Sequence, residues 1–259
     1  MKRILVFAIC FFLIFGACAL PSSAQEERYQ WYCKHVKGHL QPPLDTELSF
    51  VEELGGYYLD RSCKDPFAGE KVIYLTFDVG YENGNVAKTL DVLKEEGVCA
   101  AFFILGHLVT HDTELVKRMT DEGHTVCNHT ARHKDMSAFK DEDFLEELHA
   151  LEKLYREHTG YEMAPFYRPP EGKFSRSNLG CAMQNGYKTV FWSFAYPDWD
   201  NERQMSPEKA KQIILDNTHN GEIMLLHPTS STNAQILGDI IQQLKSEGYR
   251  FATLDELGT

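Results

Sequence analysis

The chain of 259 residues contains 43% hydrophobic and 12% aromatic residues and carries a formal net charge of −12. This hydrophobic content is enough for one sizeable core, so we expect one domain of catalytic size and an additional arm. A surface this acidic argues against nucleic-acid binding and against adhesion to anionic lipid.

The first residues have the layout of a secretory signal peptide. Lys2 and Arg3 precede an apolar run over residues 4–20, and small residues follow at 22–24 before the chain becomes charged. We therefore predict a signal peptide over residues 1–24 and a secreted or cell-envelope location. A retained membrane anchor and a lipid attached at Cys18 are alternatives that we rank lower, because the run is borderline in length for a span and Phe15 fits a lipoprotein cleavage site poorly.

Cysteine usage does not indicate a disulfide framework. Cleavage after residue 24 would leave five of the seven cysteines, an odd number at irregular spacing. Cys33 and Cys63 form a possible pair in an exported protein. The other three lie in apolar surroundings and are expected to be small buried hydrophobic residues: Cys99, Cys127 and Cys181.

Residues 25–70 are aromatic and polar, and we expect them to form an arm packed on the main domain, residues 71–259. The arm has one helix candidate, over residues 45–54. From Lys71 onward, strand and helix patterns alternate. Strands are predicted over residues 71–77, 98–105, 124–129, 188–195, 222–227 and 250–256, with a short one within 165–172. Helices are predicted over residues 85–96, 112–122, 141–160, 175–185, 207–217 and 233–247. About seven β/α units favour an α/β barrel or a doubly wound sheet.

Polar side chains stand at the ends of successive predicted strands. In chain order these are Asp78, His107, His129, Arg168, Asp198 and His227. Catalytic groups of such folds gather at the carboxyl ends of the strands, so together these residues indicate a site.

The histidines of "NHTARH" are spaced so that both rings could converge on one metal ion if the turn after the strand is helical. Taken alone, His129 and His133 fit better as exposed or hydrogen-bonded surface histidines. Asp78 would complete the site, either as a third ligand or as a base acting on water. His227 closes an apolar strand and is either a satisfied terminal histidine or a general acid.

Two further stretches could support these groups. Arg168 precedes two prolines, so its guanidinium could be held against a carboxylate such as Asp78, although a structural ion pair is the simpler interpretation. In "YPDWD", Asp198 could orient an imidazole, and Trp199 suits either a sugar ring or the core.

Five motifs carry a resemblance to a known family. In order, "TFDVG", "HTARH", "RPPEG", "PDW" and "LLH" resemble the motifs of the polysaccharide deacetylases, the chitooligosaccharide deacetylase homology domain or carbohydrate esterase family 4. The resemblance implies a distorted (β/α) barrel of about seven units. It also implies a hydrolase that cleaves the amide bond of N-acetylated sugars with the help of a divalent metal ion such as zinc.

Longer stretches resemble one branch of that family, the delta-lactam-biosynthetic de-N-acetylases of spore-forming bacteria. They are "YLTFDVGYENG", "FFILGH", "RPPEGKFS", "GYKTVFWSFAYPDW" and the upstream "GHLQPP". This resemblance implies removal of acetyl from N-acetylmuramic acid residues that lack a stem peptide, which leads to the muramic delta-lactam of spore cortex. The alternatives are a deacetylase for N-acetylglucosamine in peptidoglycan or chitin-like chains, and a catalytically silent glycan-binding protein. Peptidoglycan glycan strands are the expected partner, and we expect a monomer.

The family's roles fall on named positions of this sequence. Asp78 would be the catalytic base and His227 the acid, with Arg168 positioning Asp78 and Asp198 tuning His227. His129 and His133 would bind the metal. Four residues would contact substrate: Trp199 and Leu225 in the acetyl pocket, Tyr81 and His107.

Val79 departs from the family pattern, which usually has a second acidic residue there as a metal ligand. A valine side chain offers no ligand atom. We therefore expect the metal ion to be bound more weakly than in a site with an added carboxylate.

Overall fold

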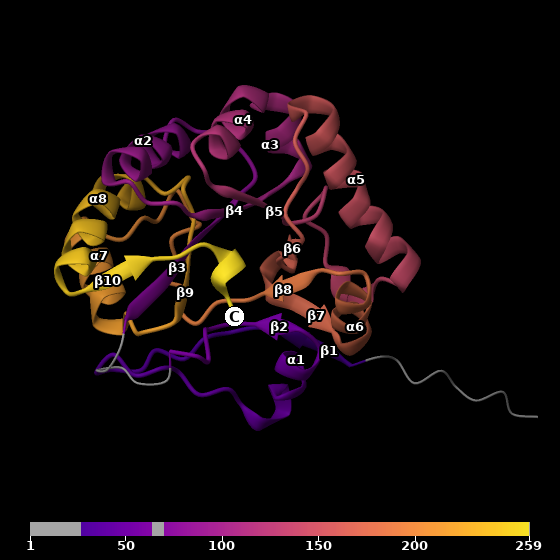
Figure 1. The fold of residues 1–259 in the computed structure, drawn as a ribbon, viewed down its shortest axis with the longest axis horizontal. Coiled ribbons are helices and arrows are strands. Elements are labelled where there is room, and N and C mark those ends of the chain that lie inside the picture. Colours follow the sequence, from indigo (N-terminus) through magenta and orange to yellow (C-terminus); the bar gives the residue numbers. More distant parts are fainter. Residues whose placement is uncertain (1–26, 64–69, 259) are drawn as a thin grey trace, which may run out of the picture.

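The structure of the protein is a computed structural model, which describes residues 27–63 and 70–258. It consists of a curled, mostly parallel sheet enclosed by helices (Figure 1). The predicted signal peptide, residues 1–24, and Cys18 lie outside the described residues. The expected α/β fold of the barrel type is confirmed.

Eight strands form the main sheet, and all of their ladders are parallel. The strands are β2 (Gly56–Tyr57), β3 (Lys71–Val79), β4 (Ala101–Ile104), β5 (Thr125–Asn128), β6 (Phe166–Tyr167), β8 (Lys188–Val190), β9 (Glu222–Leu226) and β10 (Tyr249–Phe251). Their order is β10-β3-β4-β5-β6-β8-β2, and β9 pairs with β3. A bridge between Phe194 and Met224 links the chain after β8 to β9, so the sheet curls back on itself. The carboxyl ends of β3, β5, β6 and β9 therefore face a common space.

The helices lie outside the strands (Figure 1). They are α2 (Val86–Glu96), α3 (Gly106–His111), α4 (Thr113–Asp121), α5 (Asp141–Thr159), α6 (Arg176–Gln184), α7 (Pro207–Asn217) and α8 (Ser231–Ser246). Local sequence explains several of their ends. Ser206 caps α7 by accepting a hydrogen bond from the Lys209 N–H, and Gly160 ends α5 in the left-handed conformation at φ 81°.

Three predicted elements differ from the structure, and one helix was not predicted. The last strand, expected over residues 250–256, ends at Phe251 and is followed by the 3-10 helix η4 (Leu254–Glu256). The strand expected over residues 188–195 ends at Val190, because the chain then makes only the single bridge at Phe194 where the sheet curls. The helix expected over residues 45–54 is two short pieces, the 3-10 helix η1 (Thr46–Leu48) and α1 (Phe50–Glu53). Helix α3 was not predicted, since its six residues are too few to show a helical period.

Residues of the expected arm join the barrel at two places. Strand β1 (Arg28–Gln30) pairs antiparallel with β7 (Lys173–Ser175), and β2 pairs with β8. Trp31 follows β1, stacks on Phe191 at 4.5 Å between ring centroids and donates from its indole N–H to the Trp192 carbonyl at 2.9 Å. The indigo segment in Figure 1 accordingly lies along one side of the barrel.

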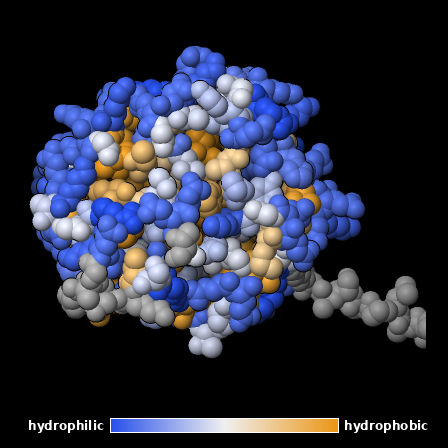
Figure 2. Space-filling view, viewed as in Figure 1, coloured by the Kyte–Doolittle hydropathy of each residue, from blue (hydrophilic) through white to orange (hydrophobic). Residues whose placement is uncertain are grey.

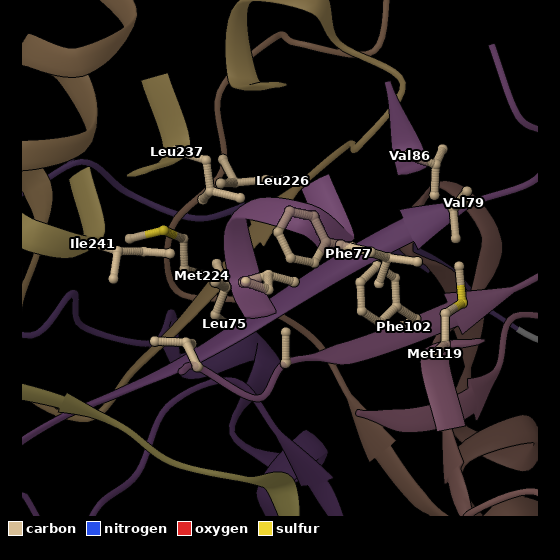
Figure 3. Close-up of a cluster of buried hydrophobic side chains, with 14 of the residues drawn as sticks. Leu75, Phe77, Val79, Val86, Phe102, Met119, Met224, Leu226, Leu237 and Ile241 are labelled. Atoms are coloured by element: carbon tan, nitrogen blue, oxygen red, sulfur yellow. The ribbon is translucent and has the colours of Figure 1, made fainter. Parts of the chain in front are cut away.

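Strand β3 is buried on both faces, and alternate residues serve different layers. One set of side chains points out toward the helices and joins the largest hydrophobic cluster: Ile73, Leu75, Phe77 and Val79. Figure 3 shows Val79 beside Val86 in this cluster, near the stacked pair Phe77 and Phe102. The other set faces the barrel interior and ends with Thr76 and Asp78. Strand parity thus places neighbouring positions 78 and 79 on opposite faces.

Cys33 and Cys63 are free thiols, so the possible pair is not formed. Cys127 and Cys181 are buried as expected, whereas Cys99 is only partly buried, contrary to the expectation. No helix within the described residues is both long and apolar enough to cross a membrane. Hydrophilic residues cover most of the face shown in Figure 2, with apolar residues visible in the gaps between them.

Candidate active site

Asp78 and Arg168 form a buried ion pair at the carboxyl ends of β3 and β6. Nη1 of Arg168 donates to Oδ1 of Asp78 at 2.7 Å. The fully buried guanidinium is held by three further hydrogen bonds. Nη2 donates to Thr76 Oγ1 at 2.9 Å and to the Phe191 carbonyl at 3.3 Å, and Nε donates to the Val190 carbonyl at 2.9 Å. Because Thr76 is on β3 and Val190 on β8, Arg168 is tied to two strands and holds the Asp78 carboxylate in a fixed position.

The charges around Asp78 keep it ionised. Burial alone would raise the pKa of this carboxyl group, but the charge of Arg168, together with the interactions with His129 and His227, outweighs burial and lowers it below its ordinary value. Asp78 is therefore a carboxylate at neutral pH, with Oδ1 bound to Arg168 and Oδ2 turned toward His129. Such a group can accept a proton from a water molecule held beside it.

His129 follows β5 and presents one defined nitrogen to the site. Its Nδ1 lies 2.8 Å from the Arg168 carbonyl oxygen, which can only accept, so Nδ1 carries the proton. Its Nε2 faces Asp78 Oδ2 at 3.5 Å. Burial lowers the pKa of His129 to about 4, so the ring is neutral and Nε2 has a free lone pair.

His133 lies close to His129, but the turn between them has a different conformation from the one expected. The two rings are 5.1 Å apart between centroids. The turn between them is not helical, since Thr130 and His133 adopt left-handed conformations at φ 72° and 54°. The His133 N–H donates to Thr130 Oγ1 at 3.0 Å, which closes the turn. We expected a helical turn between the two histidines, and this prediction was wrong. The two rings nevertheless converge.

A buried carboxylate holds this histidine turn. Glu147 of α5 has no exposed surface, and its Oε1 accepts from the Arg132 main-chain N–H at 3.0 Å. The Arg132 guanidinium wraps around the same carboxylate, with Nε 2.9 Å from Oε2. The side chain of Asn128 adds support, since its Oδ1 accepts from the Thr130 N–H at 2.9 Å. The strained turn is therefore anchored at both ends.

His227, at the end of β9, is oriented by Asp198. Its Nδ1 lies 2.7 Å from Asp198 Oδ1, and its main-chain N–H donates to Oδ2 at 2.7 Å. Asn233 completes the arrangement by donating to Asp198 Oδ2 at 2.6 Å. Burial alone would lower the pKa of His227, but the charge of Asp198 and the hydrogen bond to it outweigh burial and raise the pKa. His227 can therefore hold a proton near neutral pH and donate it.

These groups line one cavity of about 780 Å³. Asp78, His129, His133 and His227 all border it, and so do three of the residues expected to contact substrate: Tyr81, Trp199 and Leu225. The fourth, His107, is not among the lining residues. It lies on α3, exposed to solvent, and stacks on His111 at 3.8 Å between ring centroids. We call this space the catalytic cavity.

The chemistry of a divalent metal ion fits two of the lining residues. His129 has its free Nε2 at the cavity, and the His133 ring is adjacent. In residues 27–63 and 70–258, no three His, Cys, Asp or Glu side chains form a metal-holding group. Val79 contributes nothing because only 2% of it is exposed and it faces the outer hydrophobic cluster. Within the described residues, the site thus presents two imidazoles, in a pattern that suits a divalent cation.

Several residues of the site escaped the sequence interpretation. The cavity wall includes residues of the N-terminal segment, among them Tyr32 and His35, and these carry no motif that marks them. Glu147 and Asn233 lie in ordinary amphipathic helices. Thr76 could have been found, because it is two residues before Asp78 and therefore on the same face of the strand.

Fold and site together define a carbohydrate deacetylase, and comparison with known proteins places the chain in a family. The sequence profile of the family described as polysaccharide deacetylase matches residues 67–190. The chain is also 37% identical over 246 residues, 95% of its length, to a relative that bears a deacetylase name. This chain belongs to the polysaccharide deacetylase family.

That relative is the peptidoglycan-N-acetylmuramic acid deacetylase PdaA of Bacillus subtilis, of which the alignment covers 91%. The solved structure of B. subtilis PdaA, described as a family 4 carbohydrate esterase, superposes with a TM-score of 0.83 and 38% identity over 89% of this chain and 97% of that one. A peptidoglycan-N-acetylglucosamine deacetylase of Bacillus cereus is 33% identical over 190 residues, which cover 71% of this chain and 67% of that protein.

Proposed function

We propose that this protein is an exported peptidoglycan deacetylase that removes the acetyl group from N-acetylmuramic acid residues lacking a stem peptide. The observation that carries this proposal is the pairing of an ionised Asp78 with a protonatable His227 at one cavity. Similarity to PdaA along nearly the whole chain supports the choice of N-acetylmuramic acid over N-acetylglucosamine. The product would lead to the muramic delta-lactam of spore cortex.

Amide hydrolysis needs a base for the attacking water and an acid for the leaving nitrogen. Asp78 takes a proton from the water as its oxygen bonds to the acetyl carbon. His227 then donates its proton to the sugar nitrogen as the carbon–nitrogen bond breaks, which yields acetate and a free amine. Arg168 keeps Asp78 ionised and aimed at the cavity, and Asp198 maintains the proton on His227.

We further propose that His129 and His133 bind a divalent cation such as zinc, with Nε2 of His129 as one ligand atom. When bound, the cation would supply polarisation of the acetyl carbonyl and of the attacking water. The role of the protein is to keep the His129 ring neutral and in place and to anchor the turn that carries His133. The hydrogen bond from His129 to the Arg168 carbonyl and the Glu147 anchor of the turn do this.

The test is acetate release from spore-type glycan whose stem peptides have been removed, compared with release from chitooligosaccharides. We expect release from the muramyl glycan, loss of release after chelation, and recovery with micromolar zinc. Preferential release from chitooligosaccharides would indicate the N-acetylglucosamine alternative. A folded protein that binds glycan but releases no acetate at any zinc concentration would instead be the silent binding protein.

A further inference from the structure

A second hollow, of about 480 Å³, adjoins the catalytic cavity. Its wall includes Trp199 and Pro197, which also line the catalytic cavity. The rest of its lining comes from residues that follow in the chain, among them Arg203, Gln204 and Lys209. The two spaces are therefore neighbours that share Trp199 and Pro197 as a common wall.

Trp199 stands exposed between the two spaces. It is 60% exposed, although its ring lies 6.3 Å from the His227 ring between centroids. An indole left in solvent at the mouth of a site offers a broad apolar face to a sugar ring. A glycan strand whose reacting sugar occupies the catalytic cavity would pass this ring on its way out, which brings the next part of the strand to the second hollow.

The segment that forms the second hollow is tied to the catalytic machinery. The Gln204 side-chain amide donates to the Asp198 carbonyl at 2.9 Å and to the Asp200 carbonyl at 2.8 Å. Its Oε1 accepts a hydrogen bond from the Ser230 hydroxyl at the start of α8. Because Asp198 itself holds His227, the wall of the hollow has a defined position relative to the general acid.

The charges of the two spaces differ. The catalytic cavity is bordered by the carboxylates of Asp78 and Glu171, and its lining includes no lysine or arginine. The second hollow is bordered by the cations Arg203 and Lys209 and by one carboxylate, Asp200. Arg203 is only loosely paired, with Nε 3.9 Å from Asp200 Oδ2. Lys209 makes no ion pair with any residue that the structure describes.

We propose that the second hollow binds a carboxylate carried by the glycan strand on the far side of Trp199 from the reacting sugar. The proposal rests on the proposed function, because a muramyl strand without stem peptides carries free lactyl carboxylates. An enzyme with a net charge of −12 repels such a strand, so a local pair of cations beside the cleft would offset that repulsion where the strand leaves the site.

The experiment measures binding with turnover removed. All variants also carry Asp78→Asn, which removes turnover. The double variant Arg203→Gln/Lys209→Gln and the control Lys211→Gln are compared for their affinity for muramyl glycan without stem peptides. Lys211 lies on α7, as Lys209 does, but it forms an ion pair with Asp239 of α8 at 3.3 Å. The same proteins are then titrated with glycan whose carboxylates have been reduced to alcohols.

We expect the double substitution to weaken binding of the carboxylated glycan about 5- to 10-fold at low salt and less at high salt, and to leave binding of the reduced glycan unchanged. In active enzyme, the same substitution should raise KM and leave kcat unaltered. Equal weakening for both glycans, or no weakening beyond that of Lys211→Gln, would overturn the proposal. Because binding is read without turnover, absence of acetate release from the wild-type protein would count against the proposed function alone.

Discussion

Arg168 contacts Asp78 with its side chain and His129 with its main chain. Nη1 donates to Asp78 Oδ1 at 2.7 Å, and the carbonyl oxygen accepts from His129 Nδ1 at 2.8 Å. One residue therefore sets both the ionisation of the base and the tautomer of a candidate metal ligand. The consequences of this arrangement can be tested one group at a time.

Replacing the base should remove turnover and preserve the fold. Asp78→Asn keeps the volume and can still accept from Arg168, but an amide is not a base. We expect acetate release to fall about 10³-fold, with little change in the melting temperature. Asp216→Asn, an exposed carboxylate on α7, is the matched control. Retained activity in Asp78→Asn would assign the base role to another group.

The charge of Asp198 should set the alkaline limit of activity. His227 must be protonated to act as the acid, so kcat should fall as pH rises through its pKa. Because Asp198 raises that pKa, Asp198→Asn should lower it and move the alkaline limb of the pH profile to lower pH. An amide oxygen at position 198 can still accept from the ring. An alkaline limb that stays in place would exclude His227 as the titrating acid.

Glu147 should stabilise the histidine turn, although it does not line the catalytic cavity. Glu147→Gln removes the charge that holds Arg132 and weakens the anchor of residues 129–133. We expect zinc affinity, measured by isothermal titration, to fall about 10-fold. Glu146→Gln is its neighbour on α5 but exposed to solvent, so it should bind zinc like the wild type. Equal affinities in both variants would refute a positioning role for Glu147.

Val79→Asp tests the orientation of position 79. The side chain is buried beside Val86 in an apolar cluster (Figure 3), so a carboxylate there has no partner and should destabilise the protein by about 3 kcal/mol or more. The measurement is urea unfolding in the presence of a chelator. Val79→Thr, with nearly the same shape, should cost less. An Asp variant as stable as the wild type would show that this side chain can turn into the catalytic cavity.

Sequence alone determined the features that depend on local pattern. Alternating apolar strands and amphipathic helices predicted an α/β barrel or a doubly wound sheet, and the family resemblance favoured the barrel. Polar residues at strand ends singled out Asp78, His129, Arg168 and His227. The order of the motifs indicated the family. These predictions succeed because strand parity, helical period and chain order are properties of neighbouring residues.

Only the tertiary structure decided how those groups meet. Two left-handed residues, and not a helical turn, bring His133 to His129, and the buried Glu147 that stabilises them is far along the chain. Strand parity puts positions 78 and 79 on opposite faces, but only the packing of β3 decides that Val79 faces the helices, and α3 carries His107 out of the cavity lining. The second hollow beside Trp199 arises where the loop that carries this residue meets the start of α7. Such contacts depend on long-range pairing and burial, which no local pattern encodes.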